Sequence, residues 1–225
     1  LVPHTEAIEL VLGFASEMQN EGMTLNRFSP GGGFAIAYTE DDEPPTKDAY
    51  AKAITEALIE GCKQNGLNQP ELTIEPGRSM SGPAGVAIYT VGAIKEIPDV
   101  RTYVSVDGGM GDNIRPALYG SRYIAVLANQ PTAEATETVT IAGKYCESGD
   151  VLVTDAKLPK VQPNDIIAIP ASGAYAPSMA STYNMNGKPP IVMVDNGNTR
   201  LIRRRESFED MMSQDIIDPI AKDPL

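Results

Sequence analysis

The hydrophobic pattern of this chain changes near Arg78, and this change constrains the fold more than any other feature. Before it, two amphipathic helical patterns alternate with short apolar runs that lead into glycine-rich turns, as in βα units. After it, β-branched runs recur between turn signals with little helical periodicity. The sequence therefore predicts an α/β segment, residues 1–78, followed by a β-domain, residues 79–225, with the boundary in the glycine cluster at 77–85.

Two helices and two strands are predicted in the first segment. One helix is expected to start at a Thr5 cap, and the other to run from about Thr46 to Gln64. The runs "LNRF" and "ELTIE" are the predicted strands, because the turns "SPGGGF" and "PGRS" follow them. The second helix places one apolar stripe toward the core, which makes Cys62 a core residue rather than a reactive one: Tyr50, Ile54, Leu58 and Cys62.

The second segment is predicted to be an antiparallel barrel or sandwich. Its apolar runs are "GVAIYTVGAI", "RTYVSV", "RYIAVLA", "ETVTIA", "DIIAIP", "IVMVD" and "TRLIR". Two βα units cannot close a barrel, and an open parallel edge is unstable alone. The first segment is therefore expected to pack on another chain or on further residues of a larger protein.

Composition and charge exclude several classes of partner. The net charge of -12 disfavours a nucleic acid, and the basic run at 203–205 is followed at once by acidic residues. The sequence has no apolar run of about 20 residues, so we expect no membrane partner. Two distant cysteines indicate a reducing cytoplasm, and one histidine, His4, argues against a zinc cluster or a histidine-based triad, so no metal is expected.

Two glycine-rich turns could form an anion site. Adjacent glycines at 31–33 allow backbone N–H groups to approach a phosphate closely. In "EPGRS", Glu75, Gly77 and Arg78 place a carboxylate beside a counter-charge at the end of the next strand. The alternatives are an ordinary βα turn and a strand exit with a surface ion pair.

Three other residues could bind a carboxylate-containing ligand. Arg115 and Tyr119 stand four residues apart in "DNIRPALYG" and share a face if this stretch is a helical turn. Tyr175 lies among small residues in "SGAYAPSMASTYN", where its hydroxyl could reach a ligand. Tyrosines in β-rich domains also serve as packing residues with one exposed end, which is the competing interpretation.

The stretch "KYCESGD" places a thiol beside a carboxylate on a glycine turn. Buried structural cysteines normally have apolar neighbours, whereas Cys146 is followed by Glu147 and by further residues typical of turns. A reactive cysteine and a surface loop that happens to contain one are both consistent with this pattern.

The ordered combination of motifs resembles the diaminopimelate decarboxylases, pyridoxal-phosphate enzymes with the alanine racemase-like fold that are related to ornithine and arginine decarboxylases. The resemblance covers nearly the whole chain and is carried by "SPGGGFAIAY", "EPGRSMSGPAG", "VDGGMGDNIRPALYG", "CESGD", "SGAYAPSMASTYN" and "LIRRRESFED". It implies that residues 1–78 are the C-terminal part of a (β/α)8 TIM-like barrel, that residues 79–225 are the C-terminal β-domain, and that a homodimer shares its active sites.

The resemblance also implies roles for individual residues. Glu75 would pair with the pyridine nitrogen of pyridoxal 5'-phosphate, Cys146 would protonate the carbanion in the other subunit's site, and Glu147 would meet the distal ammonium of the substrate. The remaining cofactor contacts would be Gly32, Gly33, Gly77, Arg78 and Tyr175. The substrate carboxylate would be bound by Arg78, Arg115, Tyr119 and Tyr175.

The implied reaction is decarboxylation of meso-2,6-diaminopimelate to L-lysine. A decarboxylase for ornithine, arginine or carboxynorspermidine and a non-catalytic regulatory relative remain alternatives. The family's lysine that binds the cofactor as a Schiff base, and the histidine that stacks on its ring, belong to a segment that is not present here, and His4 does not match that histidine. Pro30 also removes one backbone donor before the glycines. Complete catalysis would therefore require the rest of the barrel.

Overall fold

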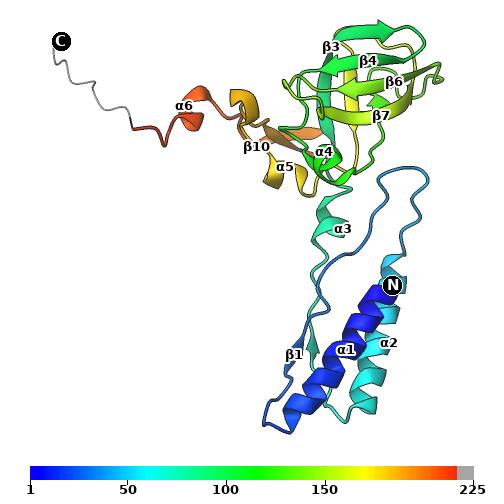
Figure 1. The fold of residues 1–225 in the computed structure, drawn as a ribbon, viewed down its shortest axis with the longest axis vertical. Helices are drawn as coiled ribbons and strands as arrows, with labels where there is room; N and C mark the ends of the chain where they lie inside the picture. The colour runs from blue at the N-terminus through cyan, green and yellow to red at the C-terminus, as the bar shows by residue number, and fades with distance from the viewer. Residues whose placement is uncertain (217–225) are drawn as a thin grey trace, which may run out of the picture. The chain divides into compact units, whose positions relative to one another are not determined.

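The computed structural model describes residues 1–216, which form two compact units (Figure 1). The first unit contains residues 1–87 together with 169–175. The second contains residues 88–168 and the described residues 176–216. A short segment after the sheet of the second unit therefore returns to the first unit.

The first unit is built on two long helices and a pair of very short strands. The helices are α1 (Val2–Gln19) and α2 (Lys47–Gln64), and α3 (Gly77–Ser81) is a single short turn. The strands β1 (Arg27–Phe28) and β2 (Glu71–Leu72) pair in parallel. The helices and the chain around β1 enclose one apolar core: Ile8, Leu12, Phe28, Phe34, Tyr50, Ile54, Leu58 and Cys62.

The two helix starts differ in how well the sequence predicts them. At α2 the predicted cap is confirmed, since Thr46 Oγ1 accepts a hydrogen bond from Ala49 N at 3.1 Å. The Thr5 cap is wrong, because α1 already begins at Val2 and Thr5 Oγ1 donates to the carbonyl of Val2 within the helix. Pro3 accounts for the earlier start, since its fixed φ suits the first turn of a helix.

The second unit contains a six-stranded sheet in the order β5-β8-β3-β4-β6-β7, which curls toward a barrel (Figure 1). Its strands are β3 (Ala87–Ile97), β4 (Arg101–Val106), β5 (Val126–Leu127), β6 (Glu137–Ala142), β7 (Val151–Leu158) and β8 (Ile166–Ile169). Side chains from neighbouring strands, among them Val104, Ile141 and Ile167, are completely buried and form its core.

The sheet is mixed, which corrects the prediction of an antiparallel domain. Strands β4 and β6 pair in parallel, with Tyr103 opposite Thr140 and Ser105 opposite Ala142. Parallel neighbours need a long crossover connection, and residues 107–136, which include β5 and the short helix α4 (Arg115–Tyr119), supply it. The pairs β3–β4, β5–β8 and β6–β7 are antiparallel as expected.

The last described part of the second unit consists of short elements. They are α5 (Ala176–Met179), the 3-10 turn η1 (Tyr183–Met185), β9 (Ile191–Asp195), β10 (Asn198–Arg203) and α6 (Phe208–Met211). Strands β9 and β10 form an antiparallel hairpin. A reciprocal capping box between Ser207 and Asp210 starts α6.

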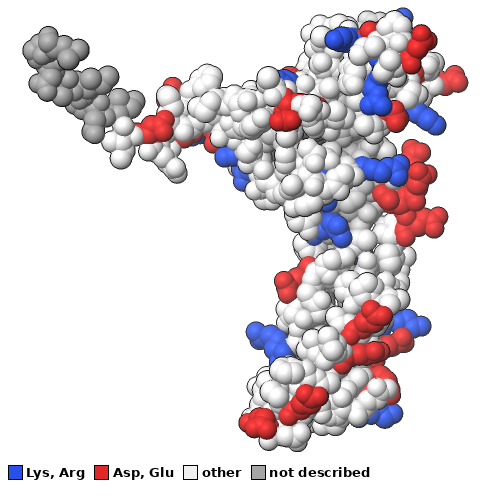
Figure 2. All heavy atoms as spheres, viewed as in Figure 1, with Lys and Arg blue, Asp and Glu red and all other residues white. Residues whose placement is uncertain are grey.

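Charged side chains are scattered over the face drawn in Figure 2, where Lys and Arg stand singly among Asp and Glu. Within residues 1–216, no helix combines the length and the apolar character that crossing a membrane requires. The same residues contain no group of three or more His, Cys, Asp or Glu side chains placed to hold a metal ion.

Candidate active site

The first candidate region, the glycine loop (residues 29–34), lies at the carboxyl end of β1. Its neighbour across the strand pair is the segment from Glu75 to Arg78, which follows β2. Because the two strands are parallel, both segments emerge at the same edge of the sheet. Ligands of α/β folds bind at this edge.

Hydrogen bonds join the glycine loop to the second segment. Ser29 Oγ donates to Glu75 Oε1 at 2.7 Å, and Glu75 N donates to the carbonyl of Gly31 at 3.3 Å. Arg78 donates from Nε to the carbonyl of Phe34 at 3.2 Å and from Nη2 to that of Gly33 at 3.3 Å. The predicted neighbours Gly33, Glu75 and Arg78 therefore lie together.

His4 supports the glycine loop from the core side. Its Nε2 lies 2.9 Å from the carbonyl oxygen of Gly32, and its ring packs at centroid distances of 5.7 Å from Phe34 and 5.5 Å from Tyr50. The Tyr50 hydroxyl accepts a hydrogen bond from Ala35 N at 3.1 Å. The only histidine of the sequence is thus part of the packing that fixes the loop.

The glycine loop has the features that a bound phosphate group needs. Within residues 1–216, the backbone N–H groups of Gly32 and Gly33 have no protein acceptor. A Cβ at residue 32 would lie 2.7 Å from the carbonyl oxygen of Glu75, so this approach requires glycine. Unpaired N–H groups on a loop without side chains form an anion-binding concavity, and Tyr175 belongs to the same unit.

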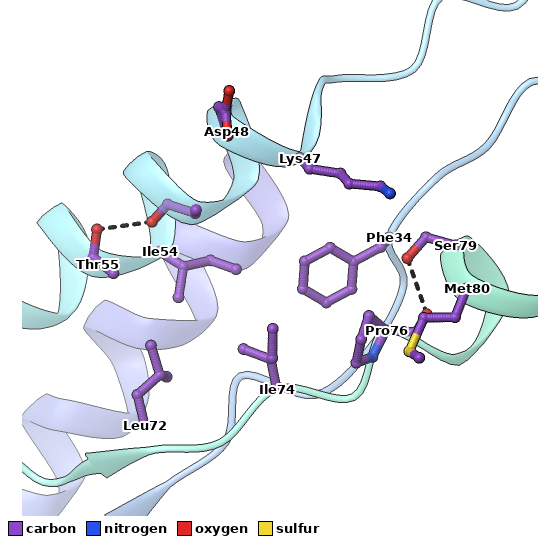
Figure 3. A pocket seen from close by; sticks show the side chains of 11 residues that line it. Phe34, Lys47, Asp48, Ile54, Thr55, Leu72, Ile74, Pro76, Ser79 and Met80 are labelled. Carbon is purple, nitrogen blue, oxygen red and sulfur yellow. Dashed lines mark hydrogen bonds between the residues drawn. The ribbon is translucent and has the colours of Figure 1, made fainter.

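An apolar groove of about 400 Å³ adjoins the glycine loop in the first unit (Figure 3). In the close-up, Phe34, Ile54 and Ile74 point into it, with Leu72, Pro76 and Met80 along its rim. The side chains of Ile74 and Met80 are 47% and 72% exposed. Apolar surface of this extent beside a two-residue strand pair marks a face that is built to be covered.

The second candidate region, the cysteine turn (residues 145–150), connects β6 to β7. The thiol of Cys146 is free and exposed, and Glu147 is exposed beside it. At the inner end of the turn, the buried Asp150 carboxylate accepts hydrogen bonds from Met110 N at 2.6 Å and Tyr145 N at 2.8 Å. A Cβ on Gly143 would collide with this carboxylate, so the backbone closes tightly around it.

Burial shapes the protonation of the groups under the cysteine turn. It raises the pKa of Asp150, although the hydrogen bonds from Tyr145 and Met110 oppose it. It also raises the pKa of Asp112, whose carboxylate accepts from Gly109 N at 3.0 Å. Burial and the two carboxylates raise the pKa of Tyr145 to about 12, so its phenol stays neutral.

Residues of η1 contact the tip of the cysteine turn. Asn184 Oδ1 accepts a hydrogen bond from Cys146 N at 3.1 Å, and the Tyr183 hydroxyl donates to Glu147 Oε2 at 3.4 Å. The Tyr183 ring also stacks on that of Tyr145, with centroids 5.9 Å apart. Asp150, Tyr183 and Asn184 stand in the motifs "KYCESGD" and "SGAYAPSMASTYN", but the sequence assigns them no role, because their contacts with the turn are defined only in the folded structure.

Of the predicted pair in α4, Arg115 lies in the interior and Tyr119 lies on the surface. The helical turn from Arg115 to Tyr119 is present. Arg115 is buried and its Nη1 donates to the Tyr123 hydroxyl at 2.9 Å, whereas Tyr119 is 63% exposed. Both belong to the second unit with Cys146 and Glu147, while the predicted cofactor contacts belong to the first.

The sequence that contains the glycine loop and the cysteine turn matches a known family model. Residues 25–173 match the model described as pyridoxal-dependent decarboxylase, C-terminal sheet domain. The chain belongs to this family. The match to the pyridoxal-dependent decarboxylase model covers two thirds of the sequence, including the glycine loop and the cysteine turn.

Several curated relatives of this chain are named diaminopimelate decarboxylase. The chain is 44% identical over 215 residues to the diaminopimelate decarboxylase of Synechocystis sp., which covers 96% of this chain and 46% of the relative. It is 50% identical over 186 residues to that of Bacillus subtilis, covering 83% and 42%. The chain therefore spans about half the length of the curated relatives it matches.

Solved structures of pyridoxal-dependent decarboxylases share the fold. A diaminopimelate decarboxylase from M. jannaschii in complex with L-lysine has a TM-score of 0.89 at 37% identity and covers 97% of this chain and 49% of its own. One from Helicobacter pylori with L-lysine has a TM-score of 0.81 at 33% identity, covering 93% and 50%. A lysine/ornithine decarboxylase from Vibrio vulnificus, at 24% identity and a TM-score of 0.67, shows only the shared fold.

Proposed function

We propose that this chain is the C-terminal portion of a carboxy-lyase that converts meso-2,6-diaminopimelate to L-lysine and carbon dioxide, with pyridoxal 5'-phosphate as cofactor. The observation that carries the proposal is the exposed Cys146–Glu147 pair, held in a fixed turn of the second unit, in a chain 39–51% identical to proteins named diaminopimelate decarboxylase. Solved relatives with bound L-lysine support the same product.

The architecture that we propose is the end of a (β/α)8 barrel in residues 1–78 and a β-domain in residues 79–225. The parallel pair β1–β2 and the exposed groove beside it support this assignment, since a barrel would supply the strands that cover such a face. The cofactor-binding lysine and the stacking histidine would come from the part of the relatives that residues 1–225 do not match.

In the proposed site, the first unit binds the cofactor, which supplies an electron sink when bound. The N–H groups of Gly32 and Gly33 would hold its phosphate, together with Gly77, Arg78 and Tyr175. Glu75 would keep a proton on the pyridine nitrogen. Ser29 already orients the Glu75 carboxylate through its 2.7 Å hydrogen bond, so this acceptor is fixed before any ligand binds.

The second unit would select the substrate and deliver the proton. Glu147 would pair with the distal ammonium, and Arg78, Arg115, Tyr119 and Tyr175 would bind the distal carboxylate, which simple lysine lacks. Cys146 Sγ would donate a proton to the carbon that loses carbon dioxide. In a cytoplasmic homodimer, each subunit's cysteine turn would serve the partner's cofactor, and the free thiol of Cys146 suits a reducing compartment.

Turnover of the natural full-length protein tests this function. With pyridoxal 5'-phosphate and meso-2,6-diaminopimelate, we expect equal amounts of carbon dioxide and lysine. Ornithine, arginine and carboxynorspermidine should release little carbon dioxide under the same conditions. A holoenzyme that is active only on one of those three would overturn the substrate assignment, and a cofactor-free, inactive full-length protein would favour the regulatory alternative.

A further inference from the structure

The cysteine turn is fixed at its base but depends on a second segment at its tip. The Asp150 carboxylate holds the base through Tyr145 N and Met110 N. The carboxylate does not contact the tip, because Cys146, Glu147 and Ser148 are exposed and extend beyond it. The direction of the thiol must therefore be set by whatever contacts the tip.

Two consecutive residues of η1 contact two consecutive residues of the tip. Asn184 binds Cys146 through the backbone N–H, and Tyr183 binds Glu147 through the carboxylate. The stacking of Tyr183 on Tyr145 fixes the ring from which that hydroxyl extends. One segment, to which no role is assigned, thus contacts both residues that the proposed function assigns to chemistry. The other oxygen of the Glu147 carboxylate, Oε1, accepts from Ser148 Oγ at 3.3 Å and from Gly149 N at 3.5 Å within the turn.

This segment is anchored at both ends and adopts a costly backbone between them. Before η1, Ser181 N donates to the carbonyl of Gly111 at 2.9 Å, and after it Lys188 N donates to Glu206 Oε2 at 3.0 Å. Between these anchors, Asn184 has φ 51° and Met185 has φ 57°, both in the left-handed region. Methionine rarely adopts this conformation, and such local strain persists where the surrounding structure imposes it.

We propose that Asn184 and Tyr183 are positioning residues for the proposed reaction. Asn184 sets the direction of the Cys146 side chain by fixing the peptide from which it extends, and Tyr183 holds the Glu147 carboxylate for the distal ammonium of the substrate. An amide suits the first task because it accepts a hydrogen bond without placing a negative charge near the thiol. A carboxylate at the same position would raise the thiol pKa.

The test uses glycine and aspartate variants in the full-length holoenzyme. Asn184→Gly removes the amide while keeping a left-handed backbone free of strain, so loss of folding is not expected. We expect kcat to fall about 10-fold or more with KM changed less than about threefold, because a displaced thiol affects only the proton transfer. Tyr183→Phe should instead raise KM for the substrate about threefold or more, with a smaller effect on kcat.

A matched control is available in the β9–β10 hairpin. Asn196 has φ 47° and an exposed side chain that donates from Nδ2 to its neighbour Asp195 at 2.9 Å, so it is also an asparagine in a left-handed turn. Asn196→Gly should leave kcat and KM within about twofold of the wild type. If Asn184→Gly changes kcat no more than Asn196→Gly does, Asn184 is an ordinary turn residue and the proposal fails.

A readout independent of turnover separates this proposal from the proposed function on which it rests. Cys146 is exposed and Cys62 is buried, so iodoacetamide should modify Cys146 selectively. The thiol is three bonds from the nitrogen that Asn184 contacts. In Asn184→Asp, the pH midpoint of alkylation should therefore rise by about half a pH unit or more. An unchanged midpoint would overturn the positioning role, whereas an inactive wild type with a shifted midpoint would overturn only the proposed reaction.

Discussion

The glycine loop and the cysteine turn are held in different ways. Backbone carbonyls of the glycine loop are bound by Arg78 and His4, and the loop follows directly from a strand whose sequence predicts it. The cysteine turn depends on Asp150, which reaches Met110 across 40 residues, and on Asn184, which lies 38 residues from Cys146. Both regions depend on side chains that are far away in sequence, since Arg78 lies 44 residues from Phe34. They differ because Arg78 stands in a motif that predicts an anion site, "EPGRS", whereas no role can be assigned to Asp150 or Asn184 from the sequence.

Both units combine a buried core with exposed apolar residues. In the second unit, residues such as Val104, Ile141 and Ile167 are completely buried by neighbouring strands. In the first unit, Leu10 and Phe14 of α1 are 77% and 58% exposed, although other residues of that helix are buried. The second unit also exposes apolar residues, with Val194 at 69% and Leu201 at 59%, so both units present apolar surface that further residues or another chain would cover.

The largest effect on folding is expected at Asp150. Asp150→Ala leaves two backbone donors, Met110 N and Tyr145 N, without their acceptor, and should lower the free energy of unfolding by about 2 to 5 kcal/mol. Asp165→Ala is the matched control, because its partly exposed carboxylate also accepts a backbone N–H, from Gln162 at 2.8 Å. Urea unfolding measures both losses of unfolding free energy. If the two variants lost equal amounts, burial of the Asp150 carboxylate would not explain its effect.

A smaller effect is expected in the glycine loop. Gly32→Ala places a Cβ 2.7 Å from the Glu75 carbonyl oxygen, which pushes the loop away from its neighbour and should weaken pyridoxal-phosphate binding about 10-fold or more. Cofactor titration of the full-length protein by absorbance measures this. Gly13→Ala, in an open position of α1, should leave the affinity unchanged. If Gly32→Ala also left the cofactor affinity unchanged, the close approach of residue 32 to the Glu75 carbonyl would not be needed for cofactor binding.

The pH dependence of stability should be stronger at the cysteine turn, because the half-buried Asp112 and the buried Asp150 lie under it. Burial raises the folded-state pKa of Asp112 above its usual 3.8. The stability associated with its protonated form is present below pH 3.8 and is lost as pH rises through the raised pKa. Asp112→Asn should therefore gain stability relative to wild type as pH increases toward 7, measured by urea unfolding at several pH values. A constant difference would show that Asp112 titrates normally.

The smallest effect is expected at the exposed ion pair across β1 and β2. Arg27 Nη2 and Glu71 Oε2 are 3.1 Å apart, but their side chains are 69% and 65% exposed. Glu71→Gln should change the free energy of unfolding by less than about 1 kcal/mol, and added salt should reduce the difference further. A loss comparable with that of Asp150→Ala would mean that exposed contacts support the first unit as strongly as buried ones support the second.

The sequence predicted the elements whose signals are local. The stripe of α2, its Thr46 cap, and the strands before both glycine turns were predicted correctly. The parallel pairing of β4 with β6 was missed, because a single strand's alternation contains no information about the direction of its neighbour. Strand β7 was absent from the predicted runs, although "VLVTDAKL" alternates as a strand does.

The exposure of the cysteine turn was predictable from the sequence, but the contacts that support the turn were not. "CESGD" correctly indicated an exposed cysteine beside a glutamate. Its last residue, Asp150, looked like part of the same exposed turn, yet the carboxylate is buried because the turn folds back over it. Tyr183 and Asn184 end the quoted motif "SGAYAPSMASTYN", but they received no role from it, since their partners are defined only once β6, β7 and η1 are placed together.

The most direct measurement for the whole account compares the two cysteines in turnover. In the full-length holoenzyme with meso-2,6-diaminopimelate, Cys146→Ala should lower the rate of carbon dioxide release about 100-fold or more, because the proton donor is lost. Cys62→Ala, in the buried core, should retain nearly normal turnover below its unfolding temperature. Near-normal turnover by the Cys146→Ala enzyme would contradict the central claim and return the cysteine turn to an ordinary surface loop.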